Sequence, residues 1–147
     1  MLALESYTYF TNVAGYDYEF ESIGKKGIIK KIARFSKIGD PLIYNFGFGD
    51  LDENTGEIND NVASNNGDQE KILNTLATII FDFSILYSEA QIYIEGTSLV
   101  KTRLYQINIG KYWNKIETIF EVFGLKDNKW HSFQKGINYE AFIGMRK

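Results

Sequence analysis

The sequence predicts an α+β protein with a largely antiparallel sheet and two helices packed on one face of it. Two observations carry this prediction: strand-like alternation gathers at both ends of the chain, and two long apolar stripes with helical spacing lie in the middle. The expected order is β-β-β-α-β-α-β-β-β, and strands clustered at both ends favour helices layered on an antiparallel sheet. The 147 residues contain no linker, repeat or low-complexity tract, so we expect one domain over residues 1–147.

The first two expected strands form a hairpin. Aromatic and acidic side chains alternate over Tyr16–Glu21, which places the rings on one face and the carboxylates on the other. Gly24-Lys25-Lys26-Gly27 is typical of a hairpin turn because glycine adopts positive φ at little cost, and Ile28–Phe35 returns as the second strand. With the turn centred between the two lysines, the side chains match on both faces, which a register shifted by one residue would not allow.

A third strand precedes a long polar segment. Leu42–Gly49 alternates large apolar residues with smaller ones, and its last two glycines leave room for another backbone or a ligand to approach. Asp50–Asn61 is polar and predicts a loop, with Val62-Ala63 as a brief return.

The first helix is predicted from about Asp68 to Tyr87. Its apolar side chains keep the i, i+4, i+7 spacing of one buried stripe. The stripe consists of Ile72, Leu76, Ile79, Ile80, Phe83 and Tyr87. Asn66 or Asp68 can cap the free N–H groups at its start.

The second half of the chain contains one more helix and the remaining strands. The helix begins after Gly96-Thr97-Ser98, and Gly110 weakens it by roughly 1 kcal/mol relative to alanine. Its broad apolar stripe consists of Val100, Leu104, Ile107, Tyr105, Ile109, Trp113 and Ile116. The expected strands are Gln91–Glu95, Ile119–Phe123, Trp130–Phe133 and Asn138–Met145, with a turn at Lys126-Asp127-Asn128-Lys129.

Missing residue types exclude several kinds of site. The chain has no Cys, which excludes disulfides, thiolate zinc sites, iron–sulfur clusters and cysteine nucleophiles. Its single His131 excludes sites that need two imidazoles. No apolar run approaches the ~18 residues of a membrane span, and Met1–Leu4 lacks the features of a secretory signal. We therefore expect a soluble cytoplasmic protein without membrane association, bound metal or cofactor.

Charge is polarised along the chain although the net charge is only −3. Residues 25–37 carry six basic side chains and no acid, whereas residues 50–70 carry seven acids and no base. The hairpin register places Glu21 opposite Lys30 and Asp17 opposite Arg34, so the basic run is partly neutralised. Together with a pI of about 5.2, this argues against a nucleic-acid partner.

Five stretches resemble a family of small uncharacterised bacterial proteins, a domain of unknown function. They are Tyr16–Gly27, Asn45–Asp50, Asn65–Asp68, Thr102–Tyr105 and Gly136–Phe142. The resemblance spans nearly the whole chain and implies a bacterial single-domain protein. It implies no catalytic residues.

The best candidate for an anion site is the start of the second helix. Thr97 and Ser98 can cap it, its free N–H groups favour a negative charge, and Lys101 and Arg103 add positive charge. A capped helix with Arg103 paired to Glu95 or Glu140 explains the same residues.

Other candidates are weaker. Glu140 could point into a cleft with Arg103, and Asn66 could contact a ligand from its Asn-Asn-Gly-Asp turn. Asp50-x-Asp52-x-Asn54 is similar to the start of a calcium loop, but glycine falls at position seven and Asn61 at position twelve, so we assign a hairpin loop.

These observations favour a non-enzymatic protein-interaction module over an enzyme. An aromatic-rich chain with polarised charge suits a protein partner or a homo-oligomer, bound through a Tyr-rich or acidic surface. The alternative is a protein or enzyme that binds a small anion or a nucleotide at Gly96–Ser98 with Arg103. The ligand-binding candidates are Thr97, Ser98, Lys101, Arg103, Glu140 and Asn66.

Overall fold

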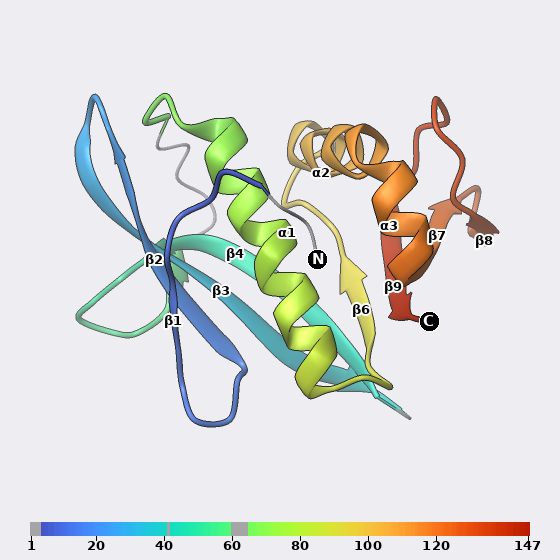
Figure 1. Cartoon of the computed structure of the whole chain (residues 1–147), viewed down its shortest axis with the longest axis horizontal. Helices are drawn as coiled ribbons and strands as arrows, with labels where there is room; N and C mark the ends of the chain where they lie inside the picture. Colours follow the sequence, from blue (N-terminus) through green and yellow to red (C-terminus); the bar gives the residue numbers. More distant parts are fainter. Residues whose placement is uncertain (1–3, 41, 60–64) are drawn as a thin grey trace. The chain divides into compact units, whose positions relative to one another are not determined.

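A computed structural model describes residues 4–40, 42–59 and 65–147, which form nine strands and three helices (Figure 1). The strands are β1 (Phe10–Thr11), β2 (Asp17–Gly24), β3 (Gly27–Gly39), β4 (Ile43–Leu51), β5 (Ile58–Asn59), β6 (Gln91–Ile94), β7 (Phe120–Lys126), β8 (Lys129–Ser132) and β9 (Ala141–Arg146). The helices are α1 (Gln69–Leu86), α2 (Leu99–Lys111) and α3 (Trp113–Ile119). The predicted class is confirmed: the protein is mixed α and β with a mostly antiparallel sheet.

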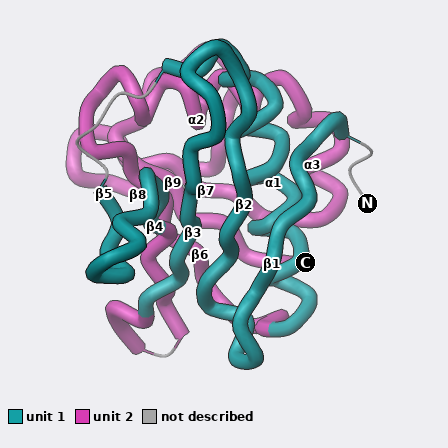
Figure 2. The backbone as a smooth tube through the Cα atoms, turned by 90° about the vertical axis from the view of Figure 1, so that its left-hand side faces the viewer, with its two compact units in different colours: residues 1–36, 47–86 teal, residues 37–46, 87–147 magenta. Residues whose placement is uncertain are grey.

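The chain has two compact units, which Figure 2 distinguishes by colour. Unit 1 comprises Met1–Ser36 and Gly47–Leu86, and unit 2 comprises Lys37–Phe46 and Tyr87–Lys147. Strands β3 and β4 each contribute residues to both units.

In unit 1, β2 and β3 form the predicted hairpin in the predicted register. Asp17 lies opposite Arg34, Tyr18 opposite Ala33 and Glu21 opposite Lys30. Burial alternates along β2, because its aromatic side chains face the core while its carboxylates face outward. The register of β2 and β3 is therefore set by side chains that match on both faces of the hairpin.

Helix α1 covers the inner face of this hairpin. It spans Gln69–Leu86, within one residue of the predicted bounds at each end. Leu76, Ile79 and Phe83 of the predicted stripe are buried, and the Phe83 ring stacks on Phe35 of β3 with centroids 3.8 Å apart. These three members of the apolar stripe therefore belong to the core of unit 1.

In unit 2, β4, β6, β9, β7 and β8 follow one another in hydrogen-bonded order. The β4–β6 pair is parallel, and the pairs that β9 and β7 make are antiparallel. Asp127 and Asn128 both have positive φ, as a two-residue hairpin turn between β7 and β8 requires. Phe142 of β9 is fully buried at the centre of this unit.

The structure differs from the predicted elements in several ways. β9 begins at Ala141 and not at Asn138, and Val100 and Ile107 of the apolar stripe predicted for the second helix are exposed, so that stripe is not buried as a whole. The predicted second helix is two helices, and the break at Tyr112 lets Trp113 pack against Phe133 with ring centroids 4.6 Å apart. The two-residue strands β1 and β5 are additional, so the predicted order is incomplete. The predicted return at Val62-Ala63 lies outside the described residues. The packing of two helices on one face of the sheet stays a prediction.

Candidate interaction site

At the start of α2, some of the polar groups are already hydrogen-bonded within the chain. Ser98 is the N-cap, as predicted, and its hydroxyl accepts from the Lys101 N–H at 3.2 Å. The Gly96 N–H donates to the Thr102 hydroxyl at 3.0 Å. Thr97 is exposed. The capped helix start is therefore present as predicted, with some of its donors already bonded within the chain.

Arg103 and Glu140 are not joined by an ion pair. Arg103 is half-buried on α2, and its Nη1 is enclosed without a hydrogen-bond partner. Glu140 is exposed, and Glu95 accepts instead from the Tyr93 hydroxyl at 2.7 Å. Among the described residues, the expected pairing of Arg103 with either carboxylate is thus wrong.

Asn66 belongs to unit 1, whereas Arg103 and Glu140 belong to unit 2. Its side chain is buried, accepts from the Lys26 N–H at 2.6 Å and donates to the Gly27 carbonyl at 3.0 Å. Of the two predicted caps, Asn66 is not one, because these bonds hold the β2–β3 turn instead, whereas Asp68 directly precedes α1 and its carbonyl accepts from the Ile72 N–H. Gly24 makes this approach possible: a Cβ there would lie 1.9 Å from the Asn66 carbonyl oxygen.

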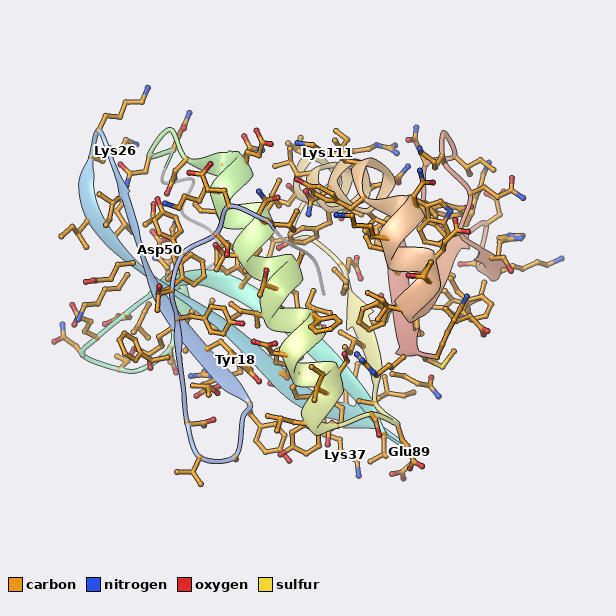
Figure 3. All side chains as sticks on the ribbon, viewed as in Figure 1. Tyr18, Lys26, Lys37, Asp50, Glu89 and Lys111 are labelled. Carbon is orange, nitrogen blue, oxygen red and sulfur yellow. The ribbon has the colours of Figure 1, made fainter. Side chains whose placement is uncertain are left out.

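Three bases of the basic run in unit 1 form ion pairs, two of them with the acidic run. Asp50, labelled in Figure 3, forms a largely buried ion pair with Lys31. Lys30 lies 2.7 Å from Glu53, and Arg34 pairs with Asp17 at 2.8 Å.

The loop of the weak calcium candidate is held by the chain itself. The Asp52 carboxylate accepts from the backbone N–H groups of Asn54 at 3.0 Å and Thr55 at 3.4 Å. The described residues contain no cluster of three potential metal-ligating side chains. The predicted loop Asp50–Asn61 is a hairpin loop in its described part, but it is shorter than predicted: Asp50 and Leu51 end β4, Ile58 and Asn59 form β5, and only the residues between them are a loop.

An extended N-terminal strap, Leu4–Tyr9, crosses α1 and leads to β1 (Figure 1). The Tyr7 N–H donates to the Thr75 hydroxyl at 2.8 Å, and the Tyr7 hydroxyl donates to Asp68. The Tyr9 hydroxyl donates to Asp82. Burial and these carboxylate bonds raise the pKa of both tyrosines, so both phenols stay protonated at pH values where an exposed tyrosine ionises.

A groove of about 480 Å³ lies between the strap and the edge of β2. It is lined by Tyr7, Thr8, Phe10, Glu19, Phe20, Glu21, Ile23 and Lys30. The Tyr7 and Phe20 rings stack with centroids 5.8 Å apart, whereas Phe10 is 77% exposed and Ile23 is 60% exposed. The groove thus has an aromatic lining and apolar side chains open to solvent.

Two carboxylates carry the charge of this groove. Glu19 and Glu21 are exposed, and neither forms an ion pair in the described part of the chain. Lys30 lies opposite Glu21 in the register, but its ammonium is bonded to Glu53. The groove therefore has an acidic rim.

Sequence reasoning did not find this groove. The one usable signal was the alternation of Tyr7 and Tyr9 before the first predicted strand, which marks an extended segment with two rings on one face. The acidic side chains of the hairpin were correctly predicted to lie on its outer face. The position of the strap beside the edge of β2 was not predicted.

Comparisons with known proteins add a family and no activity. No described helix is both long and apolar enough to cross a membrane. No curated protein and no solved structure matches the chain. One family model, described as "Family of unknown function (DUF6934)", matches residues 3–147. The chain therefore belongs to this family of unknown function, as its five characteristic stretches indicated.

Proposed function

We propose that the chain is a non-enzymatic protein-interaction module of a bacterial cytoplasmic protein, which binds another protein or a second copy of itself. The observation that supports this proposal is the groove beside β2, where exposed Phe10 and Ile23 flank the unpaired carboxylates Glu19 and Glu21. Aromatic residues are enriched where proteins bind one another. Contiguous apolar surface open to solvent is a mark of such sites.

The groove fits a protein segment better than a small ligand. It is open along the strand edge, whereas small-molecule sites enclose most of the ligand surface. Its acidic groups are two carboxylates on the outer face of one strand, Glu19 and Glu21, which lie two residues apart, and its other polar lining residues are Tyr7, Thr8 and Lys30. Such an arrangement suits an extended partner that runs parallel to the strand.

Two measurements test the interaction function. Size-exclusion chromatography with light scattering reports self-association, and a tagged chain captures partners from the cells in which it occurs. Phe10→Ser should abolish the association or the capture, whereas Val13→Ser, at a fully exposed position outside the groove, should leave both unchanged. A strict monomer that retains no partner, or a partner retained equally by both variants, would contradict the proposal.

A second candidate function is binding of a small anion or nucleotide at the start of α2. The enclosed Nη1 of Arg103, which has no partner, favours it. Thr97, Ser98, Lys101 and Glu140 would surround such a ligand. Thermal shifts with phosphate and with nucleotides test this: stabilisation that Arg103→Ala removes would support it, and no stabilisation by any of them would end it.

A further inference from the structure

The edge of β2 beside the groove has a gap in its pairing. Strand β1 pairs only with Tyr18 and Glu19, and no described strand pairs with the following residues of that edge. Because the Phe35 N–H donates to the Tyr16 carbonyl, the even-numbered residues of β2 direct their backbone groups toward β3. The odd-numbered residues then direct theirs toward the groove.

Glu21 is the residue at the centre of this gap. Glu19 on one side of it is paired with Phe10, and the Ile23 N–H on the other side donates to the Tyr7 hydroxyl at 3.1 Å. The backbone N–H and C=O of Glu21 lie between these two closed positions. They are the groups that an added strand would bond.

The surface around Glu21 defines the chemistry of that strand. Side chains of an added strand alternate as those of β2 do. On the outer face they would meet the carboxylates of Glu19 and Glu21, and on the other face they would meet the rings of Phe20 and Tyr7. Because Glu19 and Ile23 are already bonded, the open edge is limited to the three residues between them, which about three extended residues can face.

We propose that the groove binds an extended segment of a partner protein in which basic and apolar residues alternate, added as a strand to the edge of β2. This inference rests on the proposed interaction function and names the site and the class of partner. Lys or Arg side chains of the segment lie on the outer face and pair with Glu19 and Glu21, while its apolar side chains lie on the other face and contact the rings of Phe20 and Tyr7. The backbone of Glu21 supplies the central pair of hydrogen bonds.

A labelled peptide tests this directly. The probe is the peptide Lys-Val-Lys-Val-Lys-Val with a fluorescent label on a flexible linker. Its binding is followed by fluorescence anisotropy at low salt. Binding should be weakened at least about fivefold in the double variant Glu19→Gln with Glu21→Gln, because two exposed ion pairs are lost. The matched control, Glu117→Gln with Glu121→Gln, removes two exposed carboxylates of unit 2 and should leave binding unchanged.

Two further peptides separate charge from strand addition. The acidic peptide Glu-Val-Glu-Val-Glu-Val should not bind, and a basic peptide with proline at its third position should bind more weakly because one backbone donor is missing. In an ¹⁵N-labelled protein the probe should shift the amides of Glu19–Ile23 first. Equal binding of the acidic peptide, equal binding to both double variants, or shifts confined to unit 2 would overturn the proposal.

The outcome is distinguishable from failure of the proposed function. If Phe10→Ser removes a cellular partner but the basic peptide does not bind, the interaction function stands and the assigned partner chemistry is wrong. If light scattering shows a dimer that Glu19→Gln with Glu21→Gln disrupts, the occupant is a second copy, which also overturns the inference.

Discussion

Replacing Asn66 by alanine tests whether this residue is structural, as its bonds indicate. Its side chain accepts from the Lys26 N–H at 2.6 Å and donates to the Ser22 hydroxyl at 3.1 Å and the Gly27 carbonyl at 3.0 Å. Figure 3 shows Lys26 at the tip of the β2–β3 hairpin. A net value of about 1 kcal/mol for each bond predicts a loss of about 3 kcal/mol in the free energy of unfolding.

The assay is urea unfolding followed by circular dichroism, with thermal melting as a second readout. For a chain of this size a loss of about 3 kcal/mol lowers Tm by about 6–12 °C. Asn65→Ala is the matched control, because Asn65 is exposed and its side chain makes one bond, to the Gly67 N–H at 3.2 Å. The control should lose less than about 1 kcal/mol. Equal effects of the two variants, or no effect of Asn66→Ala, would refute the structural role.

Three further changes have defined outcomes. Gly124→Ala places a Cβ 2.3 Å from the Tyr139 ring and should cost about 1–3 kcal/mol by urea unfolding, whereas Gly144→Ala, with open space around its Cβ, should cost clearly less. Lys31→Met removes the cation from the largely buried ion pair with Asp50 and should lower the unfolding free energy by about 3–5 kcal/mol; a loss under about 1 kcal/mol would contradict the ion pair. Burial and a hydroxyl–carboxylate bond raise the pKa of Tyr93 to about 12, so its stabilising contribution is complete below pH 10 and is lost as the pH rises toward 12. The free energy of unfolding is measured for the natural chain and for Tyr93→Phe between pH 10 and 12. The difference between the two should shrink across that range, and a constant difference would refute the raised pKa.

The hairpin of unit 1 could be predicted in detail because its information is local. Apolar and charged side chains alternate on both strands, and only one register satisfies Asp17 with Arg34 and Glu21 with Lys30 at the same time. The first helix was equally predictable, since Leu76, Ile79 and Phe83 repeat at helical spacing over several turns.

The features that were not predicted depend on contacts between distant parts of the chain. The break between α2 and α3 follows the packing of Trp113 on Phe133, twenty residues later. The role of Asn66 depends on the hairpin about forty residues earlier, although its own neighbours suggested a helix cap. No local pattern carries such information.

The candidate site was predicted less well than the fold, for the same reason. The capped start of α2 was found because Ser98 and the backbone that it caps are adjacent. The groove was not found, because it forms where the strap of Tyr7 meets the edge of β2, and neither segment alone shows it.

Site-specific photo-cross-linking tests the central claim most directly, namely that the groove beside β2 contacts another protein. A photoreactive phenylalanine analogue replaces Phe10 in the groove or, as a control, exposed Val13 outside it, and the cells are irradiated. The account predicts a discrete cross-linked protein from position 10 that is absent from position 13. No product from position 10, or the same products from both positions, would contradict it.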